Sequence, residues 1–411
     1  MVTKMNALKI SKDRTTVVEE TSIPEFFLPN QILIKVKAVA ANPTDWKHIT
    51  YGLGPVGSTV GCDAAGIIIK LGKNETEQKF ITDKFGYKVG DFITGVAHGA
   101  SVLHPENGAF AEYALLDSSA CTKFTTKTTD GYEEGKKLGD IIENGSSIDS
   151  FEKAASLPVS LYTAAMVLII NFGKKLEFVD SSAEWQDADS TLLVYGGATA
   201  FAQNLLQLNK LTKSFKNVVT IASSRHEKVL KSYGVTENFD YKTEGFLETI
   251  VKKYPNINVI IDTVSNENTF NDSYVTAKKL YKNEKIKLIN LMGWDNNKVP
   301  EELRDVEKVD VGSTLLYCVF GLKVPFGPVT IPANEVYRKI AVENIPKLNK
   351  IVADGSLKCI TIKINEKEGL EGAADAVEGI ELGKNRGEKF VARIWFKRIF
   401  FFFFDIYILS K

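Results

Sequence analysis

The segment LLVYGGATAFAQNLLQL, residues 192–208, carries the strongest structural signal in the chain. A buried strand is expected over 191–195 and a helix over 199–209. The turn between them consists of small residues, namely Gly196, Gly197, Ala198, Thr199 and Ala200. Such a turn presents backbone amides at the positive end of a helix dipole, which suits a pyrophosphate. We therefore predict a dinucleotide-binding turn. Because Ala202 stands where a third glycine would fall, tight packing in an ordinary α/β domain is the alternative.

Strands and helices alternate after this turn. Further strands are expected over 218–222, 259–262 and 286–292, and a helix over 226–233. Apolar strands that alternate with helices indicate a parallel, doubly wound sheet covered on both faces.

The first 120 residues have a different pattern. Short strands bounded by glycine are expected over 31–39, 61–71, 89–96 and 108–116. Closely spaced strands of this kind predict a partly closed β-barrel. A long apolar helix is expected over 157–172, and the polar segment 122–150 is interpreted as a surface insertion. After about residue 330 the pattern is mixed again, consistent with a return to the first domain.

Length and composition limit the class of protein. A chain of 411 residues is long enough for two domains, and its apolar fraction of 44% is ordinary for a globular protein. Lys plus Arg balances Asp plus Glu at 51 each, so nucleic acid is not the expected partner. The four cysteines are widely spaced and no signal peptide is evident. A cytoplasmic location is expected, with nuclear entry left open.

The residues after the second strand of the alternating region indicate the phosphorylated dinucleotide. Ser223, Ser224 and Arg225 occupy the turn, and Lys228 lies one helical turn later. An NAD enzyme places Asp or Glu here to bind the ribose hydroxyls. Hydroxyls and cations instead accept a 2′-phosphate, so NADP(H) is the predicted cofactor. A solvated basic helix start is the alternative interpretation.

Ordered motifs cover most of the chain. They are NPTDWKH at 42–48, GCDAAGII at 61–68, VGDFITG at 89–95, GAFAEYALL at 108–116, AASLPVSLYTAAMVL at 154–168, the dinucleotide turn, and RGEKFVARI at 386–394. Through these motifs and their order, the chain resembles the medium-chain dehydrogenase/reductase superfamily. It is most similar to the quinone-oxidoreductase-like and trans-acting enoyl reductase branches, especially their fungal members.

This resemblance implies an α/β fold with two domains. A GroES-like catalytic domain, a partly closed β-barrel, would cover 1–165 and 325–395. A Rossmann domain with a doubly wound parallel sheet would bind NADP over 166–324. The apolar tail 396–411 lies past the usual end of the family and is interpreted as an extension. It is too short and interrupted to span a membrane, and interfacial anchoring is the alternative.

The resemblance also indicates whether the chain has the residues that bind zinc in related enzymes. Zinc alcohol dehydrogenases hold the catalytic metal with a Cys and a His, whose positions correspond here to Asn42 and Cys62. No cysteine lies in the stretch that would form the structural zinc lobe. We therefore predict no metal site. His98 and His104 are expected to be structural residues.

Catalytic and further cofactor residues follow from the same resemblance. Lys47 would contact the cofactor or polarise a carbonyl, and Tyr51 would donate a proton. The tyrosine of quinone reductases aligns nearer Gly54, and water is an alternative donor. The other positions implied at the cofactor are Asp45, Thr163, Tyr241, Asn385 and Arg386. Asp262 is expected to shape the cleft by hydrogen bonding.

These predictions define an NADPH-dependent oxidoreductase. It would transfer a hydride to an activated carbonyl or conjugated double bond of an aldehyde, quinone or enone, without zinc. One alternative is a trans-acting enoyl reductase of a polyketide pathway. Another is a non-catalytic NADPH-binding sensor or structural protein. The apolar segment 311–321 is either a dimerisation strand or an internal edge strand, so a monomer or a homodimer is expected.

Overall fold

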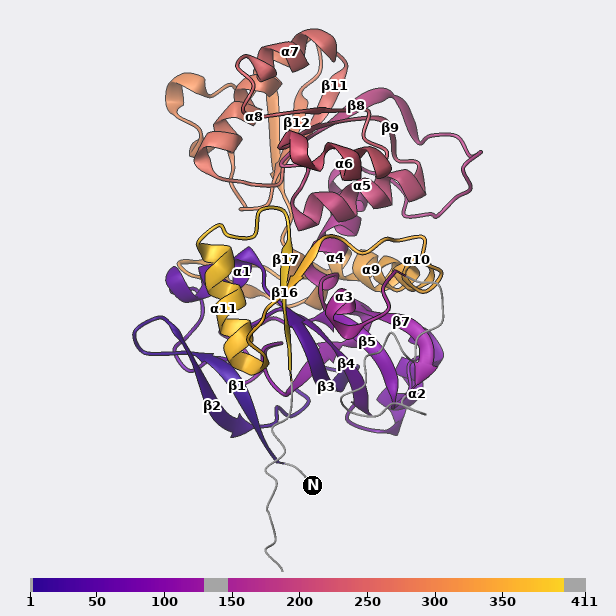
Figure 1. Ribbon diagram of the computed structural model, residues 1–411, viewed down its shortest axis with the longest axis vertical. Coiled ribbons are helices and arrows are strands. Elements are labelled where there is room, and N and C mark those ends of the chain that lie inside the picture. Colours follow the sequence, from indigo (N-terminus) through magenta and orange to yellow (C-terminus); the bar gives the residue numbers. More distant parts are fainter. Residues whose placement is uncertain (1–2, 129–146, 395–411) are drawn as a thin grey trace, which may run out of the picture.

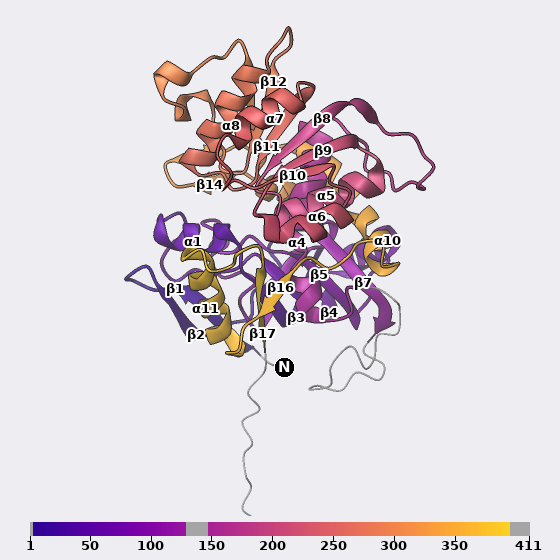
Figure 2. The same ribbon diagram turned by 45° about the horizontal axis from the view of Figure 1, so that its top comes forward.

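The computed structural model describes residues 3–128 and 147–394 (Figure 1). Two large sheets lie one above the other within these residues, as Figures 1 and 2 show. In the same part of the chain no helix is long and apolar enough to cross a membrane. The four cysteines carry free thiols. The predicted extension over 396–411 lies outside the described residues.

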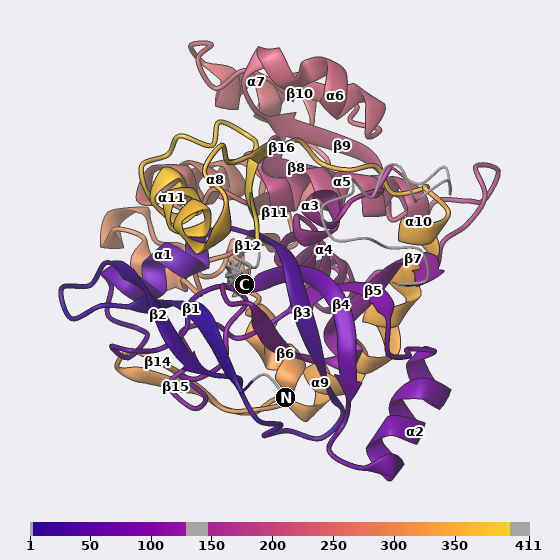
Figure 3. The ribbon, with the colours of Figure 1, turned by 60° about the horizontal axis from the view of Figure 1, so that its bottom comes forward.

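The first sheet, here called the barrel sheet, has the order β16-β17-β3-β4-β5-β7, with β6 paired to β3. Its strands are β3 (Gln31–Ala40), β4 (Asp63–Leu71), β5 (Asp91–Val96), β6 (Tyr113–Asp117), β7 (Cys121–Thr128), β16 (Ile362–Ile364) and β17 (Lys389–Arg393). Figure 3 shows β3, β4 and β5 side by side. Register shifts between β3 and β4 bend the ladder, which helps the sheet to curl. Since β17 pairs antiparallel with β3, the C-terminal part of the chain returns to this sheet, as predicted.

Several elements surround the barrel sheet. They are the hairpin β1 (Lys4–Ile10) and β2 (Thr16–Ser22), and the helices α1 (Pro43–Thr50), α2 (Glu75–Phe85), α3 (Phe151–Ala155), α4 (Pro158–Met166), α9 (Glu335–Asn344), α10 (Leu348–Ala353) and α11 (Gly369–Glu381). The α4 helix continues into a π-helical turn, η3 (Val167–Asn171), so that the predicted helix over 157–172 is confirmed.

The second sheet, here called the parallel sheet, has the order β10-β9-β8-β11-β12-β13 with every pair parallel. Its strands are β8 (Asp187–Tyr195), β9 (Phe215–Ile221), β10 (Glu237–Phe239), β11 (Ile257–Asp262), β12 (Ile286–Asn290) and β13 (Val309–Ser313). The helices α5 (Ala200–Thr212), α6 (Glu227–Ser232), α7 (Phe246–Lys253) and α8 (Glu267–Leu280) connect them.

The central strand β8 shows why both faces of the parallel sheet are covered. Successive side chains of a strand point to opposite faces. Leu192 and Val194 belong to the core that contains Leu205 of α5. Leu193 belongs to the opposite core, with Phe270 of α8. The predicted doubly wound α/β sheet is therefore confirmed.

The connections change direction on either side of β8. The chain runs outward from β8 to β9 and β10, and then resumes at β11 on the other side of β8. In open α/β sheets, ligands bind outside the carboxyl ends of the strands at such a point. The turn that begins at Gly196 follows β8 directly and lies there.

Three predictions need correction. The segment 122–150 is not wholly an insertion, because strand β7 reaches Thr128 and the Phe124 side chain is buried in the core. The strand expected over 108–116 begins only at Tyr113, since the backbone around Gly108 packs directly against that of Thr59. The segment 311–321 is only in part the expected edge strand, because β13 ends at Ser313 and a 3-10 helix, η7 (Leu316–Phe320), follows.

Candidate functional site

The predicted dinucleotide turn has the geometry that its glycines require. Gly196 has φ of +85°, and a Cβ there would lie 2.5 Å from Thr263 Oγ1. A Cβ at Gly197 would lie 2.7 Å from the Thr220 Cβ. Thr199 then caps α5, since its hydroxyl accepts the Ala202 amide at 3.1 Å. The amides of Ala200 and Phe201, the first two residues of α5, have no acceptor within the helix, so they can receive a phosphate oxygen.

The loop after β9 meets a loop of the other sheet. Arg225 Nη2 donates to the Arg386 carbonyl at 2.7 Å, and Arg225 Nε donates to His226 Nε2 at 2.9 Å. Gln203 Nε2 donates to the Ala198 carbonyl at 2.9 Å and to the Gly387 carbonyl at 3.0 Å. The structure thus brings Arg225, which follows the strand β9, and Arg386 together beside α5.

Backbone geometry places the 385–387 loop against α5 and the β9 loop. Arg386 has φ of +42°, and Gly387 has φ of +91°. A Cβ on Gly387 would approach His226 Cε1 to 2.9 Å. Only glycine therefore allows this loop to lie so close to the β9 loop.

Two further residues that were expected at the cofactor lie on the surface of the protein. Lys228 and Tyr241 are exposed, and Tyr241 retains 50% of its surface. The Ser224 amide donates to Asp240 Oδ2 at 2.8 Å, so a carboxylate lies at this loop. Sequence reasoning missed Asp240, although it stands directly before Tyr241 in the NFDYK stretch.

Lys47 reaches from the barrel domain to the parallel sheet. It lies in α1, and its Nζ donates to the Met292 Sδ at 2.8 Å, just past the carboxyl end of β12. A thioether is a weak acceptor, so the ammonium charge is poorly compensated. Burial lowers the pKa of Lys47. Lys47 therefore lies between the two sheets, at the edge where ligands are expected.

Tyr51 lies away from this edge. It caps the C-terminus of α1, is 59% exposed, and contacts Trp46 edge-on with ring centroids 5.4 Å apart. None of the contacts found in the described residues brings its hydroxyl to Lys47.

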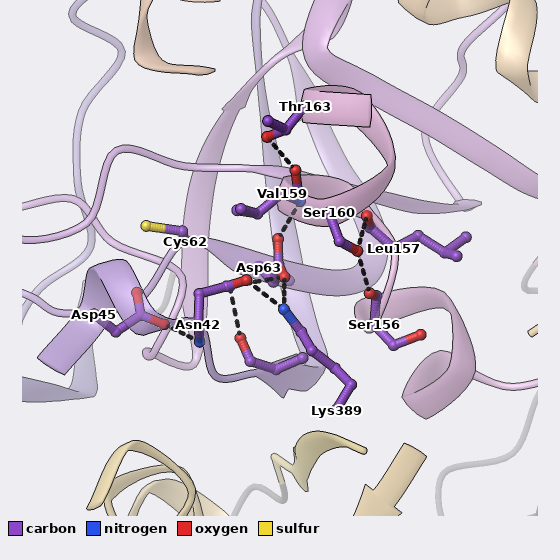
Figure 4. Close-up of polar contacts among 12 residues, drawn as sticks. Asn42, Asp45, Cys62, Asp63, Ser156, Leu157, Val159, Ser160, Thr163 and Lys389 are labelled. Atoms are coloured by element: carbon purple, nitrogen blue, oxygen red, sulfur yellow. Dashed lines mark hydrogen bonds and ion pairs between the residues drawn. The ribbon is translucent and has the colours of Figure 1, made fainter. Parts of the chain in front are cut away.

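A buried polar network connects Asn42, Asp63, Val159 and Lys389 (Figure 4). Asp63 Oδ2 accepts the Asn42 side-chain amide at 2.9 Å and lies 2.9 Å from the Lys389 Nζ. Asp63 Oδ1 accepts the Val159 amide at 2.7 Å, and the Thr163 hydroxyl donates to the Val159 carbonyl at 2.5 Å. This network joins α1, β4, β17 and α4, and it orients the helix that carries Thr163.

The two positions that correspond to zinc ligands have other partners. The Asn42 side chain binds Asp63 and Lys389. Cys62 is buried, and burial raises the pKa of its thiol well above the ordinary value, which opposes the thiolate that a metal needs. Among the residues that the structure describes, no group of three or more His, Cys, Asp or Glu could hold a metal ion. This donor set does not fit a catalytic zinc.

Asp45 is the buried acid of this region. Its Oδ2 accepts the Asn42 amide at 2.7 Å, and its other oxygen has no hydrogen-bond partner within the described part of the chain. Burial raises the pKa of Asp45 to about 7, and the nearby Asp63 acts in the same direction. Asp45 therefore stabilises the start of α1, and its position is interior rather than open to a ligand.

Asp262 forms the hydrogen bonds of the turn that follows β11. Its carboxylate accepts the amides of Val264 and Ser265 at 3.0 and 2.9 Å and the Thr269 hydroxyl at 2.8 Å. These bonds order the turn after β11, where Thr263 contacts Thr199.

Sequence reasoning missed Tyr317. The apolar segment 311–321 gave no local signal for a site, yet η7 brings the Tyr317 hydroxyl to 2.9 Å from Thr44 Oγ1 and 3.2 Å from Cys62 Sγ. Thr44 lies in the NPTDWKH motif, four residues before His48, and this helical spacing could have marked that pair.

A cavity lies beside Tyr317. Its volume is about 30 Å³, which is the room that one water molecule needs. Its lining includes Phe27, Leu28, His98, Tyr317, Phe320 and Leu322.

The fold and site define an oxidoreductase of the two-domain type, with a GroES-like domain and a Rossmann-like parallel sheet. The chain belongs to the medium-chain dehydrogenase/reductase superfamily. Residues 28–126 match the model of the alcohol dehydrogenase GroES-like domain.

Relatives cover nearly the whole chain. Uncharacterized protein YNL134C of Saccharomyces cerevisiae is 40% identical over 392 residues, which are 94% of this chain and 97% of that protein. The trans-enoyl reductase mycC of Thermothelomyces thermophilus is 26% identical, over 91% of this chain and 92% of that protein.

Solved structures share the fold. The quinone oxidoreductase from Coxiella burnetii has a TM-score of 0.63 at 22% identity, covering 95% of this chain and 100% of that one. The mycobacterial protein Rv1454c, solved in complex with NADPH, has a TM-score of 0.61 at 16% identity. The match covers 95% of this chain and 99% of that one.

Proposed function

We propose that this protein is an NADPH-dependent oxidoreductase that reduces an activated carbonyl or a conjugated carbon–carbon double bond without zinc. The observation that carries the proposal is the contact between Arg225 and the Arg386 carbonyl. It holds a guanidinium beside Ser223 and Ser224, where the dinucleotide ribose of this fold is bound. A guanidinium has five donors, and the two contacts described for Arg225 leave others for a 2′-phosphate.

Reduction without zinc is supported by the donor set at the base of the cleft. Asn42 is engaged by Asp63 and Lys389, and the Cys62 thiol favours its protonated form. The bound cofactor would supply the hydride. The chain must then bind the acceptor and stabilise the negative charge that develops on its oxygen. Lys47 is a candidate for contact with the cofactor or the carbonyl, because the partners described for its ammonium group are a thioether, that of Met292, and the ring of Trp46.

The test is a substrate screen with purified protein in which oxidation of NADPH or NADH is followed by absorbance. Unsaturated aldehydes, enones and quinones are the test substrates, and a simple saturated alcohol with NADP⁺ is the negative control. We expect turnover with NADPH at a rate well above that with NADH. Equal rates with both cofactors would contradict the NADPH preference. Tight NADPH binding without turnover of any acceptor would favour a non-catalytic sensor or structural protein.

A trans-acting enoyl reductase is the second candidate, favoured by relatives of that name such as mycC. It would share the hydride chemistry but would act on an enoyl group carried by a partner protein. Comparing a free enoyl thioester with the same group on an acyl carrier protein distinguishes the two. Much faster reduction of the carrier-bound group supports this candidate, and equal rates support the reductase of free small molecules.

Location and assembly are part of the proposal. We propose a cytoplasmic enzyme that is a monomer or a homodimer. The edge strand β13 is the surface through which a dimer would pair its parallel sheets. Sedimentation of the purified protein measures the oligomeric state directly.

A further inference from the structure

Gln203 is a buried polar residue of α5 whose side chain joins three separate segments. It is 2% exposed, and its Nε2 donates to the Ala198 carbonyl at 2.9 Å and to the Gly387 carbonyl at 3.0 Å. Its Oε1 accepts the Thr361 amide at 3.3 Å. Both N–H donors of this amide are therefore engaged by backbone carbonyls, one in the turn after β8 and one in the loop before β17.

The loop before β17 supports both predicted phosphate sites. Its Arg386 carbonyl accepts Arg225 Nη2, from the loop after β9, and its next carbonyl, that of Gly387, accepts Gln203 Nε2. A Cβ on Gly387 would lie 3.3 Å from the Ala198 carbonyl oxygen, so this loop packs closely against the turn after β8. Two successive carbonyls of one loop thus hold side chains that adjoin the predicted pyrophosphate and 2′-phosphate sites.

The Ala198 carbonyl belongs to the peptide unit that leads into α5. A peptide unit is planar, so the bond from Gln203 to this carbonyl also fixes the plane that carries the Thr199 amide. That amide donates to the Gly196 carbonyl at 3.0 Å, which closes the turn. The amides of Ala200 and Phe201 follow Thr199 directly. Gln203 therefore influences the direction in which the amides of the helix start point.

We propose that Gln203 is a positioning residue for the dinucleotide, which holds the turn after β8 in the conformation that binds the pyrophosphate and uses the Gly387 carbonyl as its anchor. This inference rests on the proposed function, in which NADPH is the cofactor. The pyrophosphate is common to NADPH and NADH, so Gln203 acts on the binding of both. Arg225, in contrast, acts on the 2′-phosphate that only NADPH carries.

The burial of Gln203 and the glycines of the turn explain why this contact matters. A buried donor without a partner is unfavourable, so the two N–H groups of Gln203 strongly favour the arrangement that keeps both carbonyls within reach. Gly196 and Gly197 give the turn conformational freedom that other contacts must restrict. Without the bonds of Gln203, the turn would have to be ordered when the cofactor binds, which lowers affinity.

The experiment compares Gln203→Met with wild type in the binding of NADPH and of NADH, each measured by titration calorimetry. Methionine is a straight side chain that fills a similar space but has no N–H donor. We expect the Kd of each cofactor to rise about tenfold, as for the loss of one or two ordinary hydrogen bonds. The ratio of the two Kd values should stay within about twofold of the wild-type ratio, whereas Arg225→Ala should change that ratio.

Gln207→Met is the matched control. Gln207 is also a buried glutamine of α5, 4% exposed and four residues after Gln203. Its Nε2 donates to the Lys358 carbonyl at 3.1 Å, and its Oε1 accepts the Lys358 amide at 2.8 Å. Neither of these bonds involves the turn after β8. Both glutamine variants should lower the urea concentration at the midpoint of unfolding, but Gln207→Met should keep the wild-type Kd for both cofactors.

Gly387→Ala tests the anchor from the other side of the contact. Gly387 has φ of +91°, and the added Cβ would lie 2.9 Å from His226 Cε1, so the loop must move. The Kd for NADH should rise here as well, because the Gly387 carbonyl no longer holds Gln203 in place.

The outcomes separate the inference from the proposed function. Wild-type Kd values in Gln203→Met overturn the inference while the proposed function stands, and so does an equal loss of affinity in Gln207→Met. A loss of affinity for NADPH alone in Gln203→Met also overturns it. If Gln203→Met does not fold, an unchanged Kd for NADH in Gly387→Ala overturns the inference instead. A wild-type protein that binds neither cofactor overturns the proposed function and the inference together.

Discussion

Asp63 and Lys389 form a buried ion pair between the start of β4 and the start of β17. Lys389 Nζ lies 2.9 Å from Asp63 Oδ2, and the two side chains are 4% and 0% exposed. The pair therefore joins the N-terminal strands of the barrel sheet to the strand that completes it from the other end of the chain.

Lys389→Met should destabilise the protein strongly. The substitution leaves the Asp63 charge buried without its partner, which costs about 3–5 kcal/mol in comparable sites. Urea denaturation followed by circular dichroism measures the free energy of unfolding. The matched control is Lys367→Met, because the Lys367–Asp375 pair is mostly exposed and should be worth less than about 1 kcal/mol. Equal losses in the two variants would contradict the special role of the buried pair.

Arg225→Ala should weaken binding of NADPH and leave that of NADH nearly unchanged. A hydrogen bond to a charged group is worth about 1.5–3 kcal/mol, which corresponds to roughly a 10- to 100-fold change in Kd. Titration calorimetry with each cofactor makes the comparison, and Lys252→Ala, an exposed lysine of α7, is the control. An unchanged Kd for NADPH would contradict a role of Arg225 in binding the 2′-phosphate.

The contribution of Asp45 to the stability of the fold should fall as pH rises from about 4 to 7. Burial raises the pKa of Asp45 from 3.8 to about 7, so the folded state holds this proton more tightly than the unfolded state. Such a group stabilises the fold below its unfolded pKa, and the contribution is lost as pH passes through the folded pKa. The pKa shift from 3.8 to about 7 corresponds to a free energy of unfolding on the order of 4 kcal/mol.

Asp45→Asn isolates this contribution. The amide oxygen can still accept the Asn42 amide but does not titrate. Denaturation curves at several pH values should show that the free energy of unfolding of the wild type, relative to that of the variant, falls between pH 4 and 7. Parallel pH profiles for wild type and variant would rule out titration of Asp45 as the cause.

Activity should survive removal of metal ions. The Asn42 and Cys62 side chains provide no thiolate and imidazole pair, so exhaustive dialysis against a chelator should leave kcat unchanged. Elemental analysis of the untreated protein should find far less than one zinc per chain. A stoichiometric zinc whose loss abolishes turnover would contradict reduction without zinc.

Local sequence predicted the elements of the parallel sheet well. The limits of β8, α5, β9 and β11 agree with the expected strands and helix to within a few residues. Their apolar runs and the glycine turn are properties of neighbouring residues. The prediction of a surface insertion over 122–150 was wrong at its start, because the polar residues of β7 give little apolar periodicity and the strand depends on pairing with β5.

The sequence by itself determined the fold class and the turn at Gly196, because each depends on residue identity or short-range backbone conformation. Only the tertiary structure decided which distant side chains meet. Tyr317 reaches Thr44, and Arg225 reaches the Arg386 carbonyl, because the strands of the two sheets place these loops at one edge. Contacts between residues so far apart in the chain depend on the packing of whole sheets, which no local pattern encodes.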